Sequence, residues 1–257
     1  MEEETYPIGI PLQSFIAVRK EASERSEMVS QLLFGECYDI LSKESNWYKI
    51  RMHLDGYEGW IDKKLVVELS ISEAEQLKAI RPFVLKAQTT PEIKGKGTIN
   101  LFPGSEVWIS SNDHEMQVKN THIKFTGHVD KEASIEKIKE IFLNAPYLWG
   151  GRTPYGIDCS GLSQIACKMM GIMLPRDASK QVLKGETINF LEEAKPGDLA
   201  FFGDEENIHH VGILLDSNRI LHASGWVKIS KIDHQGIFEP ELNAYTHHLR
   251  AVKRIKQ

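Results

Sequence analysis

The chain has 257 residues, of which 41% are hydrophobic and 26% charged, a composition that is ordinary for globular proteins of one to three domains. Its formal net charge of -5 gives no electrostatic reason to expect nucleic acid or an anionic membrane as a partner. No apolar run approaches the roughly 20 residues of a membrane span, so no membrane partner is expected.

The first residues and the cysteines bear on location. Residues 1–5 are acidic and polar, without the basic and apolar regions of a signal peptide. The cysteines are odd in number, and Cys159 and Cys167 lie about two turns apart on one predicted helix, too far for a disulfide. We therefore expect a cytoplasmic protein. Export, with a signal peptide already removed, is the alternative.

The first part of the chain has the pattern of a small β-barrel. Between residues 8 and 67, short alternating apolar runs are separated by polar turns at even spacing. The segments 47–50 and 56–61 resemble bacterial SH3-like domains, so residues 1–68 are predicted to form an SH3-like barrel. Residues 72–80 then have the pattern of a short helical linker.

A second set of short strands follows, including residues 107–109 and 116–118. We interpret residues 81–128 as a second, divergent SH3-like barrel. The third predicted domain, residues 131–257, begins with a helix over 134–142. Four apolar residues fall on one face of that helix, namely Ile135, Ile138, Ile141 and Phe142.

The next motif is typical of a mounted nucleophile. Residues 147–151 and 158–161 are rich in glycine and enclose Cys159. Apolar residues after Cys159 recur at helical spacing, which predicts one buried stripe with Ser163, Gln164 and Lys168 turned away from it. A cysteine in the first turn has its thiolate stabilised by the helix dipole, and the flanking glycines let a substrate backbone approach. A buried structural cysteine is the alternative.

A thiolate nucleophile needs a base and a group that orients the base. Residues 208–215 and 219–223 predict a β-hairpin with a polar turn between them. A register centred on Asp216 places His210 directly opposite His222 on one face, whereas a slip of one residue separates them. His209 alternates to the other face in either case.

These motifs resemble those of the NlpC-type cell-wall cysteine peptidases. The resemblance covers about residues 131–257 and includes, in the family's order, the segments 149–151, 158–161, 196–199, 210–213 and 221–223. It implies an α+β fold in which a papain-like cysteine peptidase domain follows the two SH3-like β-barrels. The implied activity is hydrolysis of the bond between D-glutamate and a diamino acid in peptidoglycan stem peptides, without a cofactor.

The resemblance also assigns roles to residues. Cys159 is implied as the nucleophile, His210 as the general base and His222 as the orienting third member. Tyr147 is implied to lie beside the nucleophile and to help shape the oxyanion site. Trp149 and Ser160, which flank the nucleophile motif, are predicted to contact substrate.

Residues 174–179 resemble the subgroup that trims free stem peptides. Asp177 then holds the free amine of an N-terminal L-alanine, although Ala178 replaces the usual small hydroxyl residue. Arg176 and Asp158 are predicted to contribute to the same substrate site. Two alternatives stay open: Asp158 as a helix cap, and Arg176 with Asp177 as a local surface ion pair.

Glu27 and Tyr57 of the first barrel are predicted to contact the free amine of the substrate, as in that subgroup. An exposed glutamate and a packed tyrosine are the alternative reading. The barrels themselves could bind the wall, or they could close one end of the cleft.

Several alternative functions would use the same residues or the same scaffold. A metal site built from His209, His210, His222 and Cys159 lacks paired ligand spacing, so no metal is expected. A hydrolase of intact wall, a noncatalytic wall-binding protein, and an amidase or acyltransferase on the same scaffold remain alternatives. The prediction is a cysteine peptidase whose partner is L-Ala-γ-D-Glu-diamino acid or a related peptide.

Overall fold

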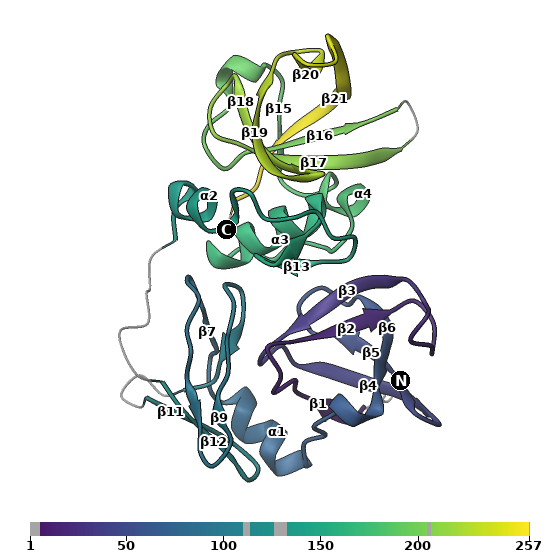
Figure 1. Ribbon diagram of the computed structural model, residues 1–257, viewed down its shortest axis with the longest axis vertical. Helices are drawn as coiled ribbons and strands as arrows, with labels where there is room; N and C mark the ends of the chain where they lie inside the picture. Colours follow the sequence, from purple (N-terminus) through teal and green to yellow (C-terminus); the bar gives the residue numbers. More distant parts are fainter. Residues whose placement is uncertain (1–5, 110–113, 126–132, 205–206, 257) are drawn as a thin grey trace. The chain divides into compact units, whose positions relative to one another are not determined.

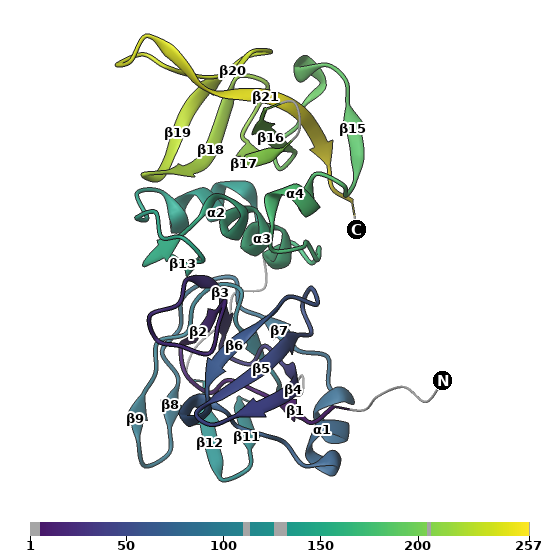
Figure 2. The same ribbon diagram turned by 90° about the vertical axis from the view of Figure 1, so that its right-hand side faces the viewer.

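The computed structural model describes residues 6–109, 114–125, 133–204 and 207–256 (Figures 1 and 2). The chain divides into two compact units, Met1–Glu132 and Ala133–Gln257, which are described separately below. Within the described ranges, no helix is both long enough and apolar enough to cross a membrane.

The N-terminal unit begins with an antiparallel sheet in the order β1-β4-β5-β6-β2-β3. Its strands are β1 Ile8–Gly9, β2 Phe15–Arg19, β3 Met28–Leu33, β4 Tyr38–Glu44, β5 Trp47–Met52 and β6 Glu58–Asp62. Alternate residues such as Ile16 and Val18 are buried, while their neighbours are more exposed. This period of two places one face of each strand in a core, as the predicted barrel requires.

Helix α1, Ile71–Lys78, follows and confirms the predicted helical segment. Its start is fixed by a capping box, in which the Ser70 hydroxyl accepts from the Glu73 N–H and the Glu73 carboxylate accepts from the Ser70 N–H.

Short strands complete the unit. They are β7 Phe83–Val84, β8 Glu92–Ile93, β9 Gly97–Thr98, β10 Glu106–Val107, β11 Glu115–Val118 and β12 Thr121–Lys124. They form a two-stranded sheet, β10-β7, and a four-stranded sheet, β11-β12-β8-β9. One apolar core includes Ile10 and Phe34 together with Leu85, Val107 and Ile123. The segment predicted as a second barrel therefore shares a core with residues of the segment predicted as the first.

The C-terminal unit combines helices with a β-barrel, which confirms the predicted α+β class. Its elements are α2 Ile135–Phe142, β13 Arg152–Thr153, β14 Gly156–Ile157, α3 Cys159–Met169, α4 Ala178–Gln181, β15 Glu186–Ile188, β16 Leu199–Gly203, β17 Ile208–Leu214, β18 Arg219–Ser224, β19 Trp226–Ile232, β20 Gly236–Glu239 and β21 Ala244–Arg254. The sheet order is β15-β21-β16-β17-β18-β19-β20, and an added pairing of β20 with β21 closes six strands into a barrel.

All six strands of this barrel contribute to one apolar core. Its buried members are Ala200, Phe202, Leu214, Ile220, Ile232, Ile237 and Val252. Helices α2, α3 and α4 lie together on one side of the barrel, and α3 and α4 both contact β17 (Figures 1 and 2). Because α3 begins at Cys159 and β17 carries His210, this packing brings two predicted site residues into one region.

Helix α3 differs from the prediction in its polar side. Ser163, Gln164 and Lys168 are buried rather than turned to solvent. The Ser163 hydroxyl bonds to the Gln181 side chain at 2.6 Å, and the Gln164 amide donates to the Leu174 carbonyl at 3.0 Å. The two side chains are buried because later parts of the chain supply hydrogen-bond partners for them.

Candidate active site

Cys159 is the first residue of α3, and the residue before it fixes the helix start. Asp158 is the N-cap, and its Oδ1 accepts a hydrogen bond from the Gly161 N–H at 2.7 Å. Its Oδ2 accepts from the Gly150 N–H at 2.8 Å. One buried carboxylate therefore joins the glycine turn before the nucleophile to the helix that carries it.

Arg176 neutralises this carboxylate. Its Nη1 and Nη2 lie 3.0 and 2.5 Å from the two Asp158 oxygens, and Nη1 also donates to the Ser160 hydroxyl at 2.7 Å. Arg176 and Asp158 are only 3% and 5% exposed. A buried ion pair of this kind is tolerated where the geometry is bidentate and the remaining donors find acceptors.

Asp177 lies near the surface. Its side chain is 38% exposed, and it forms an ion pair with Lys180 at 3.3 Å, one turn along α4. Its role in holding the substrate's amine stays a prediction. The carboxylate that pairs with Arg176 in the structure is Asp158, not the neighbouring Asp177 of the surface-pair alternative.

Two of the flanking glycines have a packing role within the domain. A Cβ on Gly161 would lie 2.3 Å from the Gly151 carbonyl oxygen, and one on Gly151 would lie 2.4 Å from the Gly156 oxygen. Any larger residue would push the helix start away from the turn that precedes it. Close packing of protein backbone, rather than approach of substrate, is the reason for glycine that the structure gives at these positions.

The Cys159 thiol is protonated in this environment. Burial raises its pKa to about 11, and the Asp158 carboxylate adds to this effect, while hydrogen bonds from the backbone of Val211 and Ser160 oppose it. The expected stabilisation of a resting thiolate by the helix start is therefore outweighed by desolvation. A base must remove the proton when the sulfur attacks.

His210 and His222 lie on one face of the hairpin, as predicted, and are in direct contact. His210 Nε2 and His222 Nδ1 are 2.9 Å apart. The predicted register, however, was wrong: Gly212 pairs with His222, so the hairpin is centred on Ser217 and the two histidines are diagonal neighbours. His209 is exposed and contacts Asp204, in agreement with its predicted alternation to the other face.

The hydrogen bonds of the two histidines fix which nitrogen faces which partner. Because His210 Nε2 is engaged by His222, its Nδ1 is the nitrogen left for Cys159. His222 Nε2 lies 2.9 Å from the Ser230 hydroxyl on β19. A neutral His210 that accepts a proton at Nδ1 carries hydrogen on Nε2, so the sequence of donors runs from His210 to His222 to Ser230.

Both histidines are neutral near neutral pH. Burial lowers the pKa of His210 well below its ordinary value, and lowers the pKa of His222 to about 3. Neighbouring histidines and Lys228 lower these pKa values further, because each would place a second positive charge nearby.

Two residues of this cluster were missed by sequence reasoning. Ser230 lies on the strand after the predicted hairpin and pairs with Ile220. In the sequence, only the register of that strand could have indicated its place. His247 comes from β21, and its ring centroid is 4.2 Å from that of His210. A histidine on a distant strand has no motif that connects it with the hairpin.

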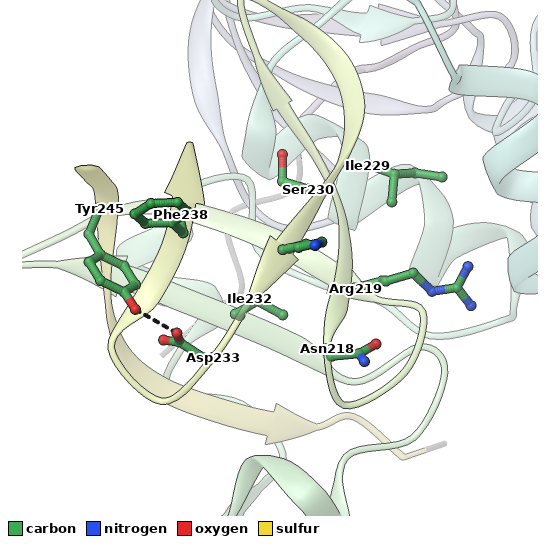
Figure 3. A pocket seen from close by; sticks show the side chains of 9 residues that line it. Asn218, Arg219, Ile229, Ser230, Ile232, Asp233, Phe238 and Tyr245 are labelled. Carbon is green, nitrogen blue, oxygen red and sulfur yellow. Dashed lines mark hydrogen bonds between the residues drawn. The ribbon is translucent and has the colours of Figure 1, made fainter. Parts of the chain in front are cut away.

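Ser230 also lines a surface hollow of about 610 Å³ on strands β18 to β21 (Figure 3). Figure 3 shows Arg219 and Ile229 on one side of this hollow, and on the other Phe238 and Tyr245, whose hydroxyl donates to Asp233 at 2.5 Å. The series of hydrogen bonds that starts at His210 therefore ends at Ser230, which lies beside solvent.

The remaining predicted substrate contacts have different exposures. Burial raises the pKa of Tyr147 to about 12, and the Cys159 charge is the next cause, which places its hydroxyl in the electrostatic surroundings of the nucleophile. Trp149 is 60% exposed. In the N-terminal unit, Glu27 is exposed with Lys20 at 3.5 Å, and Tyr57 packs partly buried against the barrel core. The substrate roles of all four stay predictions.

Metal and disulfide chemistry were also considered. Among the residues that the structure describes, no three His, Cys, Asp or Glu side chains are arranged to hold a metal ion. Cys37, Cys159 and Cys167 are free thiols and are buried.

Comparisons with known proteins identify a domain in each of the two units. Residues 144–246 match the NlpC/P60 family, and residues 18–64 match the bacterial dipeptidyl-peptidase SH3 domain. The matches show an NlpC/P60 domain in the C-terminal unit and a bacterial SH3 domain in the N-terminal unit, and with the relatives below they support a peptidoglycan-related peptidase.

Similar proteins extend over most of the chain. It is 26% identical over 235 residues to a gamma-D-glutamyl-L-lysine dipeptidyl-peptidase of Bacillus cereus, a match that covers 77% of this chain and 68% of that protein. The protein of the same name in Bacillus subtilis is 28% identical, with 76% and 71% covered. A solved NlpC/P60 family protein from Bacillus cereus has a TM-score of 0.79 at 18% identity and covers 96% of this chain and 99% of its own. This last similarity supports the predicted papain-like fold.

Proposed function

We propose that this protein hydrolyses the γ-D-glutamyl–diamino acid bond of peptidoglycan stem peptides that carry a free N-terminal L-alanine. The observation that carries the proposal is Cys159 at the start of α3, hydrogen-bonded by the backbone next to His210, whose far nitrogen is held by His222. The choice of bond is supported by the names of the Bacillus relatives.

The reaction begins from a neutral thiol and a neutral imidazole. His210 Nδ1 takes the proton of Cys159 as the sulfur attacks the γ-carbonyl carbon of D-glutamate. The negative charge that develops on the carbonyl oxygen is stabilised by backbone N–H groups at the start of α3, with Tyr147 beside them. His210 becomes an imidazolium in this step, and His222 Nδ1 accepts a hydrogen bond from its Nε2–H.

The second half releases both products. The imidazolium of His210 gives its proton to the amine of the departing diamino acid, which leaves a thioester between Cys159 and the γ-carboxyl of D-glutamate. A water molecule then attacks the thioester, and His210 removes its proton. Hydrolysis restores the thiol and frees L-Ala-D-Glu, so atoms and charges balance without a cofactor.

The free N-terminus is proposed to be held by Asp177. Support for Asp177 comes from its exposure and from Lys180, because its carboxylate is already paired with an ammonium group at 3.3 Å. An incoming substrate ammonium would replace that of Lys180. Asp158 has its carboxylate oxygens occupied by Arg176 and by two backbone N–H groups, so we give it a structural role.

A substrate with a free N-terminus is a fragment of the wall rather than the intact polymer. We therefore propose a role in the recycling of wall peptides in the cytoplasm. Hydrolysis of intact wall and acyl transfer on the same scaffold are the less favoured functions.

The test uses L-Ala-γ-D-Glu-diaminopimelate and its lysine counterpart, each in free-amine and N-acetylated form, with release of the diamino acid followed by mass spectrometry. Cleavage of the free-amine peptides alone is expected. Cleavage of both forms would favour an open site acting on intact wall. Cleavage of neither would reject the peptidase proposal, and Cys159→Ser supplies the inactive control.

A further inference from the structure

His247 is brought to the active site by two irregularities in β21. Opposite β16, the pairing shifts between Phe201–Ala251 and Phe202–Leu249, which leaves Arg250 as an extra residue. Opposite β20, the pairing shifts between Ile237 and Phe238 and leaves Thr246 extra. Bulges redirect side chains and are frequent beside active sites. These two bulges lie on either side of His247.

The redirected ring covers the face of His210. The two ring centroids are 4.2 Å apart with an interplanar angle of 34°, so the rings are in close, tilted contact. His222 meets His247 edge-on at 5.7 Å, and Phe202 lies 5.8 Å from His210 and 6.0 Å from His247. His210 is therefore enclosed by three rings, of which only His222 bonds to its nitrogen.

We propose that His247 is a positioning residue for His210: its ring, packed against the imidazole, holds Nδ1 toward Cys159. The proposal rests on the proposed function in that His210 is taken as the general base. Without this contact, the His222 bond alone leaves the His210 ring free to tilt about that bond. General-base catalysis requires the nitrogen within hydrogen-bond reach of the thiol.

Titratable groups face His247 from several strands. His210 comes from β17, His222 from β18 and Lys228 from β19, and Lys228 is paired with Glu239 of β20 at 3.1 Å. The pKa of His247 is lowered by burial and by Lys228, so the ring is neutral when His210 becomes an imidazolium. A charge on His247 in turn lowers the pKa of His210.

Two substitutions distinguish the effect of the His247 ring from the effect of a charge on that ring. His247→Phe keeps a flat ring and removes the titratable nitrogen, so kcat at pH 8 should stay within about twofold of wild type. The pKa of His210 should then rise, because a neighbouring positive charge can no longer form. Since His210 acts in its neutral form, the acid limb of kcat/KM should move to higher pH.

His247→Ala removes the ring altogether. We expect kcat to fall about tenfold or more with KM little changed, because misplacement of a catalytic group by about 1 Å can cost up to about 100-fold. His248→Ala is the matched control, since His248 is the next residue, is exposed and pairs with Gly236. It should leave both kcat and the acid limb unchanged.

The experiment measures pH profiles of kcat/KM for the full chain and these variants with the free-amine peptides. In parallel it follows the rate of Cys159 alkylation by iodoacetamide against pH, read by peptide mass spectrometry and needing no substrate. Wild-type kcat and an unshifted limb in both His247 variants would overturn the inference. If wild type cleaves none of the peptides, the substrate proposal fails, and the alkylation profile decides alone: slower alkylation in His247→Ala than in His247→Phe supports the positioning role, and equal rates in wild type and both variants reject it.

Discussion

The two sides of the candidate active site differ in how they accommodate buried titratable groups. The carboxylate side, made of Asp158, Ser160 and Arg176, keeps its charges and pairs them. The histidine side, made of His210, His222 and His247, loses its charges because burial favours the neutral rings. One side is therefore fixed by electrostatics and the other can change its protonation state.

Cys159 lies where the two sides meet, and its pKa responds to both. The Asp158 carboxylate raises the pKa of the thiol and Arg176 lowers it by a smaller amount, so the ion pair as a whole favours the protonated thiol. The proton of the Cys159 thiol must therefore be accepted by the histidine side, where His210 is neutral. Fixed geometry and proton transfer are thus assigned to different strands and helices.

The largest expected effect comes from removing the sulfur itself. Cys159→Ala should reduce turnover by about 10⁴-fold or more, because both half-reactions pass through the thiol. Peptide release measured by mass spectrometry checks this, with circular dichroism to verify the fold. Cys167→Ala is the control, since Cys167 lies on the same helix and is also buried. Turnover near the wild-type rate in Cys159→Ala would remove this residue from the mechanism.

The carboxylate side should respond most strongly in stability. Arg176→Met leaves the Asp158 charge buried without its guanidinium, which we expect to lower the free energy of unfolding by about 3–5 kcal/mol. Urea denaturation measures this difference. The double variant Asp158→Asn with Arg176→Met should recover part of the loss, because asparagine still caps α3 and carries no charge. A loss below about 1 kcal/mol in the single variant would contradict a structural ion pair.

The histidine side should instead make stability depend on pH. The folded pKa of His222 is about 3, below the unfolded value near 6.5, so the unfolded state binds more protons below pH 6.5. The contribution of neutral His222 to the free energy of unfolding is complete above about pH 6.5 and is lost as the pH falls toward 3. Each such histidine accounts for up to about 1.4 kcal/mol per pH unit. Urea denaturation between pH 7 and 5 should show a shallower decline in His222→Asn, and identical slopes would reject the neutral buried state.

Within the histidine side, the effect on catalysis should fall with distance from the sulfur. His222→Ala should slow turnover on the order of 100-fold, less than the roughly 10⁴-fold loss seen when a charged orienter is changed in a serine triad. Ser230→Ala removes one hydrogen bond at the far end and should cost about 1 kcal/mol, or about fivefold. Equal losses in the two variants, measured as kcat with the free-amine peptide, would contradict this order.

Sequence reasoning predicted the parts of the site that local patterns determine. The helix that begins at Cys159 and the shared face of His210 and His222 follow from periods of 3.6 and 2. The hairpin register was misplaced because the Asp216 side chain accepts from the Asn218 N–H at 3.0 Å, in a turn centred one residue later than expected. Alternation alone cannot distinguish two registers that keep the same face.

Long-range partners were beyond local patterns. The bond from Arg176 to Asp158 joins residues 18 positions apart, and the neighbouring Asp177 offers an equally plausible partner in sequence. His247 reaches His210 only because of two bulges in β21, whose positions depend on the pairing of three strands. Burial of Ser163 likewise depends on Gln181, which follows a loop.

The smallest effect is expected at the edge of the carboxylate side, where Asp177 is exposed. Asp177→Asn should raise KM for free-amine peptides about threefold, the scale of one exposed ion pair, and leave kcat unchanged. Discrimination against the N-acetylated peptide should fall by the same factor, because only the charged N-terminus loses a partner. Lys180→Ala is the matched control: it removes the competing ammonium at 3.3 Å and should lower KM or leave it unchanged. If Asp177→Asn keeps full selectivity for the free amine, the ammonium is held elsewhere, and Glu27 and Tyr57 become the next positions to substitute.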